Sequence, residues 1–546
     1  MLNQNKNAFL LFAVIILFLF LQSCKELTSN NHPFQKGIYD GTIGATHLIL
    51  VVSNEDSIMF SGFYIHNRKN ATEEKKPFLL ELKDNRWLFS SEEFNGLLKG
   101  NRSWGNKYQG KLVETKNRSF FSFWKNKKNI SFTKRKTPKV PSELRYKHIL
   151  FTTIDVKKDL AYGQAIGYWT ETPYLDDPYI EILGKGMINF FKAQKKLDLK
   201  LDIYLPVGDT LKKRPLVVLS HGGGFYIGNK QSETEQLLAN TFAKRGYVVA
   251  SIDYRMGFKM NETSIERGAY RTLQDLHAAL RYLSHNAVNL GIDPTQVYVA
   301  GTSAGAIASL NIAFMDNNER PKTSFKVGRR DDLGTIESSG NKFTDRFEIK
   351  AVGNMWGAVT DTSVIDIDEQ IPVISFHGTS DNIVPFEYDY PFQNTLMFNR
   401  LLANKLYGSK NIHQRLTHLN IENKLIPFIG KGHEPQLDNF KTMNALMDTI
   451  KNGLIDFFYE QTIAKVEFPP DALTINTTGT ICPLVFDIHD GELMQIEVNG
   501  GLQVSDDPKE KSVIWFKDEP VHEAIIYTNN RFRAIGKKTV AIHLSN

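Results

Sequence analysis

The chain has 546 residues, more than a single domain usually holds, so we expect two or three domains. Its composition, 41% hydrophobic and 23% charged, is that of an ordinary globular protein. The net charge of +6, spread over this length, is too weak to indicate a nucleic-acid partner, so we expect none.

The N-terminus predicts an export signal. A polar start carrying Lys6 precedes an apolar run at 8–21, which is too short for a comfortable membrane span and has the length of a signal-peptide core. The run ends in LQSC, which resembles the bacterial lipobox. This resemblance implies that residues 1–23 are removed and that Cys24 carries the lipid. We therefore expect a lipid-anchored protein of the bacterial cell envelope, with a plainly secreted protein as the alternative.

Residues 24–35 are polar and are predicted to be a tether. From 36 to 136 the sequence consists of strand-like runs, such as THLILVVS and SIMFSGFYIH, which Asn, Gly and Asp separate. We predict a small antiparallel β domain there, either a barrel or a sandwich, with no catalytic residues. Residues 137–197 begin with TPKVPSE and are predicted to be a linker that leads into the next domain.

Strand-like and helical segments alternate from 198 to 462. Continuous apolar strands end in HGGGF and in VAGTSAG, and amphipathic helical segments lie between the strands. This pattern is typical of a mostly parallel sheet that helices cover on both faces. We also expect a long helix over 387–407 and a closing helix at about 437–460. The pattern turns to β again over 465–546, which predicts a C-terminal β domain.

Three predicted strand ends carry residues suited to nucleophilic catalysis. Ser303 lies between the glycines of GTSAG, Asp381 follows IPVISFHGTS, and His433 lies in GKGHEP. A serine nucleophile needs a histidine base and a carboxylate that fixes the tautomer of the histidine. Ligands of open α/β sheets bind beyond the carboxyl ends of the parallel strands, where these three residues are expected.

The glycines of HGGGF, at 221–225, predict a site for a developing negative charge. Consecutive glycines at a strand exit cost conformational entropy, but they expose backbone N–H groups with no Cβ in the way. We predict that the N–H groups of Gly222, Gly223 and Ala304 surround an oxyanion.

Other side chains compete for the catalytic roles. Asp361, in AVTDTS, is the alternative acid, although Asp381 is favoured because it closes a strand. We expect His221 to shape the glycine loop and His377 to pack at a strand end. Two further histidines, His413 and His418, are expected to be exposed.

Several charged residues are expected to have structural roles. Asp253 and Arg255 are predicted to form an ion pair under the site. Asp275 and Asp316 are predicted to be surface or capping residues.

Taken together, HGGGF, SIDYR, GTSAG, HGTSDNIVPF and GKGHEP occur in the order and approximate spacing of the α/β-hydrolase superfamily. Residues 198–460 resemble the carboxylesterases related to hormone-sensitive lipase and the acetyl-esterase-like group. The resemblance implies an α/β-hydrolase fold and no cofactor. It also implies the roles of nucleophile, base, orienting acid and oxyanion hole for the following residues: Ser303, His433, Asp381, and Gly222, Gly223 and Ala304.

Two features depart from the pattern of that superfamily. The gap of about 50 residues between Asp381 and His433 predicts an inserted helix. The stretch IDYRMGFKM predicts a different substrate pocket near Met256. The sequence shows no metal-binding pattern such as H-E-x-x-H or C-x-x-C.

We therefore predict a serine esterase that acts through an acyl-enzyme on a small ester or an acylated carbohydrate. One alternative is a serine peptidase of the prolyl-oligopeptidase type, although that family usually has an aromatic residue before the serine, unlike GTSAG. The other alternative is a surface binding protein with an inactive hydrolase core.

Overall fold

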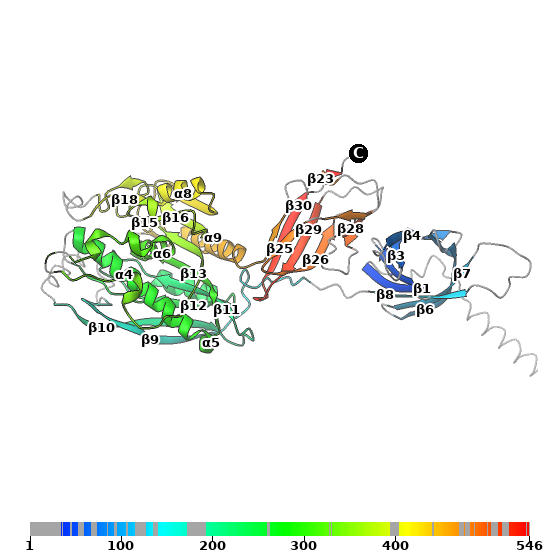
Figure 1. The fold of residues 1–546 in the computed structure, drawn as a ribbon, viewed down its shortest axis with the longest axis horizontal. Helices are drawn as coiled ribbons and strands as arrows, with labels where there is room; N and C mark the ends of the chain where they lie inside the picture. Colours follow the sequence, from blue (N-terminus) through cyan, green and yellow to red (C-terminus); the bar gives the residue numbers. More distant parts are fainter. Residues whose placement is uncertain are drawn as a thin grey trace, which may run out of the picture. The chain divides into compact units, whose positions relative to one another are not determined.

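The computed structural model describes most of the chain between 140 and 468 and the strands of both terminal regions (Figure 1). The predicted signal peptide and Cys24 lie outside the described residues. None of the helices within the described ranges has the length and apolar content of a membrane span. The described residues are 34, 37–43, 46–52, 59–66, 74–83, 86–91, 95–104, 107–114, 127–134, 140–171, 193–258, 262–326, 328, 330–393, 403–438, 442–468, 474–475, 481–484, 486–498, 501–503, 512–515, 523–541 and 543–544.

The chain divides into two compact units. The first contains residues Met1–Val140, Ala464–Asn529 and Gly536–Asn546, and the second contains Pro141–Ile463 and Asn530–Ile535. The second unit therefore takes in a short loop from the region predicted to be the C-terminal β domain.

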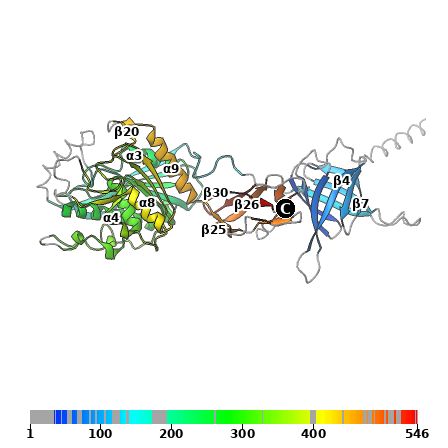
Figure 2. The same ribbon diagram turned by 90° about the horizontal axis from the view of Figure 1, so that it is seen from above.

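The N-terminal part of the first unit is a closed antiparallel barrel of eight strands, in which β1 pairs with both β2 and β8 (Figures 1 and 2). Alternate residues such as Leu48 and Leu50 point inward and are fully buried, as the two-residue period of a strand requires. Of the two predicted forms, barrel or sandwich, the structure has the barrel. Its strands are β1 (Gly37–Ile43), β2 (Thr46–Val52), β3 (Met59–His66), β4 (Glu74–Lys83), β5 (Arg86–Ser91), β6 (Asn95–Trp104), β7 (Lys107–Glu114) and β8 (Lys127–Lys134).

The C-terminal part of the first unit is also all-β. Its largest sheet has six strands in the order β24-β28-β27-β26-β29-β30, and two small sheets pair β22 with β25 and β23 with β31. Phe486, Ile496 and Ile526 lie in its core. The strands are β22 (Lys465–Glu467), β23 (Thr474–Ile475), β24 (Ile481–Pro483), β25 (Asp487–His489), β26 (Glu492–Val498), β27 (Gly501–Gln503), β28 (Ser512–Trp515), β29 (Glu523–Asn529), β30 (Ile535–Ala541) and β31 (His543–Leu544).

The second unit is built on one sheet of eight strands in the order β19-β16-β14-β13-β11-β12-β10-β9. β10 is antiparallel to both of its neighbours, and the pairs from β12 to β19 are parallel. The prediction of a mostly parallel sheet is confirmed. Its strands are β9 (Ile154–Gly167), β10 (Lys195–Pro206), β11 (Arg214–Ser220), β12 (Val248–Ile252), β13 (Ile292–Thr302), β14 (Ile349–Met355), β16 (Val373–Gly378) and β19 (Asn423–Phe428).

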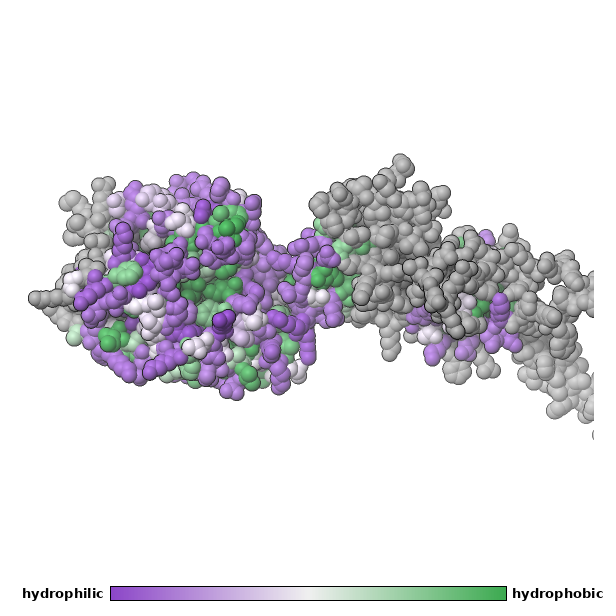
Figure 3. Space-filling view, in the orientation of Figure 1, coloured by the Kyte–Doolittle hydropathy of each residue, from purple (hydrophilic) through white to green (hydrophobic). Residues whose placement is uncertain are grey.

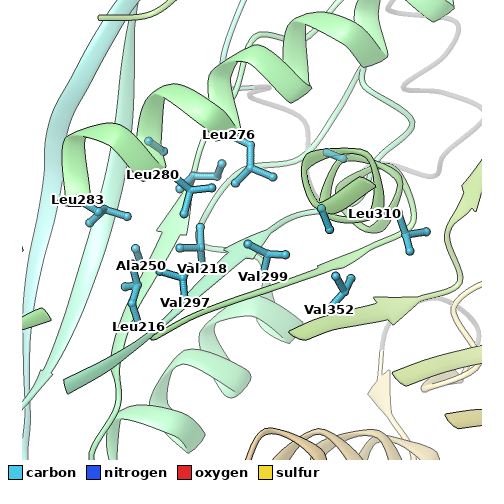
Figure 4. Close-up of a cluster of buried hydrophobic side chains, with 14 of the residues drawn as sticks. Leu216, Val218, Ala250, Leu276, Leu280, Leu283, Val297, Val299, Leu310 and Val352 are labelled. Atoms are coloured by element: carbon cyan, nitrogen blue, oxygen red, sulfur yellow. The ribbon is translucent and has the colours of Figure 1, made fainter. Parts of the chain in front are cut away.

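Helices cover both faces of this sheet (Figure 2). On one face α4 (Glu262–His285), α6 (Ala304–Phe314) and α8 (Ser409–His418) contribute to one core. Leu276 and Leu280 of α4 point there toward Val218 and Val299 of the sheet (Figure 4). On the other face α3 (Glu233–Ala243) and α9 (Leu446–Glu460) form a second core. The surface seen in Figure 3 is mainly hydrophilic over this unit, as expected for helices whose apolar faces meet the sheet.

Shorter elements connect these layers. The short helices are α5 (Ala287–Leu290), η2 (Asn317–Glu319), η3 (Lys322–Ser324), η4 (Ile336–Ser338) and η5 (Thr362–Val364), and the short strands are β15 (Ala358–Val359), β17 (Tyr388–Asp389), β18 (Leu406–Gly408), β20 (Leu437–Asp438) and β21 (Thr442–Met443).

Two predicted helices differ from the structure. At the two ends of the helix predicted over 387–407, the structure instead has the strands β17 and β18, which pair with each other. Residues 394–402, in the middle of that range, lie outside the described part of the chain. The closing helix α9 begins at Leu446, because the residues before it form the hairpin of β20 and β21. In both places short tertiary pairing overrides a local sequence pattern that is compatible with a helix.

Candidate active site

Ser303 lies in the tight turn between β13 and α6. Its backbone has φ 50° and ψ −113°, a left-handed conformation that is strained for a residue with a side chain. The turn also brings backbone segments very close together. A Cβ atom at Gly305 would lie 2.0 Å from the carbonyl oxygen of Ser220, at the end of β11. The glycines around Ser303 therefore let the serine, which is 5% exposed, occupy a sharp turn at the end of β13.

The structure brings Ser303, His433 and Asp381 together. His433 Nε2 lies 3.0 Å from Ser303 Oγ, and His433 Nδ1 lies 2.7 Å from Asp381 Oδ2. An ionised carboxylate only accepts hydrogen bonds, so Nδ1 carries the proton, and in the neutral ring Nε2 is free to accept the proton of the serine hydroxyl. The two histidine contacts therefore have the geometry that activates a serine.

Asp381 is held in place from several sides. Its Oδ1 accepts hydrogen bonds from the backbone N–H groups of Ile383 and Val384, and His377 Nε2 lies 3.2 Å from its Oδ2. Asp361, the alternative acid, is exposed instead and caps η5 by accepting a hydrogen bond from the backbone N–H of Ser363. Only Asp381 of these two carboxylates contacts His433.

Asp381 and His433 each shift the pKa of the other toward its charged form. Burial raises the pKa of Asp381, but the charge of His433 and the hydrogen bonds from His377 and His433 outweigh this effect and hold the pKa well below its usual range. Burial lowers the pKa of His433, but the charge and hydrogen bond of Asp381, together with the charge of Glu434, raise it above its ordinary value. Asp381 thus stays ionised while His433 gains and loses a proton, as a general base must.

The glycine loop follows β11 and lies beside the serine. A Cβ at Gly222 would lie 3.4 Å from Ser303 Cβ, so the backbone of this residue passes close to the nucleophile. Gly223 has φ 102°, and its carbonyl oxygen accepts hydrogen bonds from the N–H groups of Tyr226 and Ile227, which turns the loop back on itself. Ala304 is the first residue of α6, where backbone N–H groups lack intrahelical partners. Gly222 and Ala304 thus lie beside Ser303, and Gly223 follows Gly222 in the loop.

His221 shapes this loop, as predicted. Its Nδ1 lies 2.7 Å from the carbonyl oxygen of Gly222, and its ring stacks on Tyr254 at 4.2 Å. Tyr254 in turn donates a hydrogen bond to the carbonyl oxygen of His221. Burial lowers the pKa of His221 to about 4, so this ring is neutral near pH 7 and adds no charge beside the site.

The predicted ion pair between Asp253 and Arg255 is wrong. Arg255 pairs instead with Asp275 of α4, with Nη2 2.7 Å from Oδ1, and Asp253 pairs with Lys230 at 2.7 Å. Asp275 is fully buried, so its prediction as a surface or capping residue is also wrong. A buried guanidinium needs a buried carboxylate, and α4 supplies one because its polar residue faces the end of β12.

The remaining candidates have structural roles. His377 is buried at the end of β16 and contacts Ser409, and Asp316 caps η2, both as predicted. His418 is exposed, but His413 is only partly exposed and contacts Asn423. Both lie on α8, the helix found in the gap between Asp381 and His433.

An apolar cluster borders Ser303 on the side of the glycine loop. Met256 and Ala304 belong to it, and Trp169 packs against it and donates a hydrogen bond to the carbonyl oxygen of Tyr226. No pattern in the sequence marks Trp169, which lies in the predicted linker. The other buried members of the apolar cluster are Phe225, Tyr226, Tyr254 and Phe258.

Across the ranges that the structure describes, no group of three or more His, Cys, Asp or Glu side chains is arranged to hold a metal ion.

Comparison with known proteins points to the same region. Residues 201–369, which include the glycine loop and Ser303, match the family described as BD-FAE. The chain also resembles esterases. Gut esterase 1 of Caenorhabditis elegans is 38% identical over 98 residues, which are 17% of each chain. Carboxylesterase NlhH of Mycobacterium tuberculosis is 35% identical over 118 residues, 21% of this chain and 34% of that protein.

The matches agree with the predicted resemblance to α/β-hydrolase serine esterases, although this chain spans only 17% of the length of Gut esterase 1. A solved structure described as a truncated form of a carbohydrate esterase from gut microbiota is 20% identical. It covers 57% of this chain and 98% of its own, with a TM-score of 0.35.

Proposed function

We propose that this protein hydrolyses carboxylic esters and that Ser303 is its nucleophile. The observation that carries the proposal is the continuous contact from Asp381 through His433 to Ser303 Oγ, beside the glycine loop. The match of residues 201–369 to the BD-FAE family and the similarity of the chain to esterases support the same chemistry.

In the proposed mechanism, Ser303 Oγ attacks the ester carbonyl carbon while His433 Nε2 takes its proton. The carbonyl oxygen gains negative charge, which the N–H groups of Gly222, Gly223 and Ala304 stabilise. His433 then gives its proton to the leaving alcohol as the C–O bond breaks, which leaves an acyl-enzyme. Water, deprotonated by His433, attacks this intermediate and releases the acid and Ser303.

We further propose that the natural substrate is a small ester or the acyl group of an esterified carbohydrate. The export signal predicted for residues 1–23 supports this idea, because a hydrolase outside the cytoplasm meets polysaccharides there. The apolar cluster beside Ala304 offers uncharged surroundings for an acyl group. The same signal underlies the proposal that the protein is anchored to the bacterial envelope through Cys24.

The test is a hydrolysis panel with purified protein that lacks residues 1–24, with Ser303→Ala as the matched control. The panel compares acetyl, butyryl and longer nitrophenyl esters, acetylated xylan and aminoacyl-nitroanilides. We expect hydrolysis of short esters and its loss in Ser303→Ala. Preferred cleavage of nitroanilides would favour the peptidase alternative, and a protein inactive on every substrate would favour the binding-protein alternative.

A further inference from the structure

A buried carboxyl group that the proposed mechanism does not use lies next to the nucleophile turn. Glu235, in the first turn of α3, is 2% exposed. Its Oε1 accepts a hydrogen bond of 2.8 Å from the hydroxyl of Thr302, the residue directly before Ser303. Glu235 thus contacts the side chain of the residue next to the nucleophile, although the two residues that meet lie 67 positions apart in the chain.

Thr302 also touches the glycine loop. A Cβ at Gly222 would lie 3.1 Å from Thr302 Oγ1 and 3.2 Å from its carbonyl oxygen. The Thr302 hydroxyl, which donates to Glu235, therefore lies between the turn at Ser303 and Gly222 of the predicted oxyanion hole. A change at Glu235 would reach both parts of the site through this single side chain.

No cation of the described residues forms an ion pair with Glu235. The groups that interact with it are acidic or neutral: Glu434, which follows His433, and Tyr254, which follows β12. His221, at the end of β11, is neutral, and the nearest cation along the chain, Lys230, pairs with Asp253 beside β10 and β12. The helix α9 also packs on α3. There its apolar Phe458 contacts Phe242 of α3.

An ionised Glu235 would therefore add an uncompensated negative charge near the place where the substrate gains negative charge. The pKa of Glu235 is raised to about 7, because the effect of burial, to which the charge of Glu434 adds, outweighs the hydrogen bonds from Thr302 and the backbone, which lower it. Near neutral pH the group is thus close to its midpoint, with the neutral form dominant below it.

We propose that Glu235 is a positioning residue that fixes the nucleophile turn against the glycine loop through Thr302, and that the enzyme is most active while Glu235 is neutral. The inference rests on the proposed function. It predicts a bell-shaped dependence of kcat/KM on pH. Activity rises as His433 loses its proton and falls as Glu235 loses its own.

The experiment measures kcat and KM for nitrophenyl acetate from pH 5 to 9.5 in wild type and in Glu235→Gln. The amide keeps an oxygen acceptor for Thr302 but cannot ionise. We expect wild-type kcat to fall about tenfold on the alkaline side, in line with a partial loss of oxyanion stabilisation, and to stay level in Glu235→Gln. Glu233→Gln is the matched control, because this glutamate lies exposed in the same helical turn, and it should keep the wild-type profile.

A second pair of variants tests the contact itself. Thr302→Val removes the hydroxyl and should lower kcat about 10- to 100-fold with little change in KM, because the nucleophile is misplaced. Thr302→Ser restores the hydroxyl and should recover most of kcat together with the alkaline fall. This pair decides the question if Glu235→Gln does not fold.

The inference alone is overturned if an active wild type and Glu235→Gln share one pH profile, or if Thr302→Val keeps the kcat of Thr302→Ser. A wild type that hydrolyses no ester contradicts the proposed function and, with it, the role of Glu235.

Discussion

At the scale of single residues, the glycine-flanked serine shows why a short motif can predict a site. The turn at Ser303 is a local structure, so neighbouring residues in the sequence determine it. It needs a serine with a positive φ and, two residues later, a glycine that lets the carbonyl oxygen of Ser220 approach. Asp381 and His433 could also be proposed because each follows an apolar strand. Glu235 could not, because its partner Thr302 lies 67 positions away and only the folded sheet brings the two together.

The choice between the two acids gives a prediction at this scale. Asp381→Asn should lower kcat by about 10³- to 10⁴-fold with little change in KM, because the amide no longer holds the proton-bearing Nδ1 of His433 as a carboxylate does. Asp361→Asn is the control, since Asp361 is exposed and only caps η5. Steady-state kinetics on one ester compares the two variants. Equal losses in both would mean that the contact between Asp381 and His433 is not the catalytic one.

At the scale of elements, buried strands were easier to predict than edge strands. β11, β13 and β16 are buried on both faces, so they read as continuous apolar runs. β9 lies at the edge of the same sheet with many exposed residues, and its polar sequence lies within the predicted linker, 137–197. The short strands β17 and β18 depend on pairing with each other and with β15, which no local pattern records.

The link between α4 and the sheet gives a prediction at this scale. Asp275 of α4 is fully buried and pairs with Arg255 beyond β12. Asp275→Asn should lower the free energy of unfolding of the second unit by about 3–5 kcal/mol, because Arg255 would keep a buried charge without its partner. Urea unfolding, followed through the loss of ester hydrolysis, measures the change.

Asp316→Asn serves as the control, because Asp316 lies at the surface as the cap of η2, and asparagine is an equally good capping residue. Wild-type stability in Asp275→Asn would show that Arg255 does not need the carboxylate of Asp275 to compensate its charge.

At the scale of the whole molecule, the proposed lipid anchor at Cys24 gives a prediction about where the protein is found. Cys24→Ser should move the full-length protein from the membrane fraction to the soluble fraction, or block its processing, because a thioether-linked lipid needs the thiol. Labelling with a fatty acid analogue checks this outcome. Equal labelling of wild type and variant, or no labelling of either, would contradict the proposed anchor and favour plain secretion.

The boundaries of the hydrolase unit give the last prediction. The chain leaves this unit at Ile463 and contributes to it again with Asn530–Ile535. In that loop Phe532 is 4% exposed and lies in the core formed with α3 and α9, and its carbonyl oxygen accepts a hydrogen bond from the buried hydroxyl of Tyr146. A fragment that stops at 463 therefore lacks part of its own core.

Phe532→Ala in the full chain should lower the stability of the hydrolase unit by about 3–5 kcal/mol, as expected for truncating a buried aromatic side chain. A fragment of residues 141–463 should lose ester hydrolysis at a lower urea concentration than the full chain does. Arg531→Ala is the matched control, because the neighbouring side chain is 61% exposed and such changes usually have small effects. If the fragment and Phe532→Ala both match wild type, the loop adds nothing to the core; if both fall, the hydrolase depends on residues that follow it by more than sixty positions.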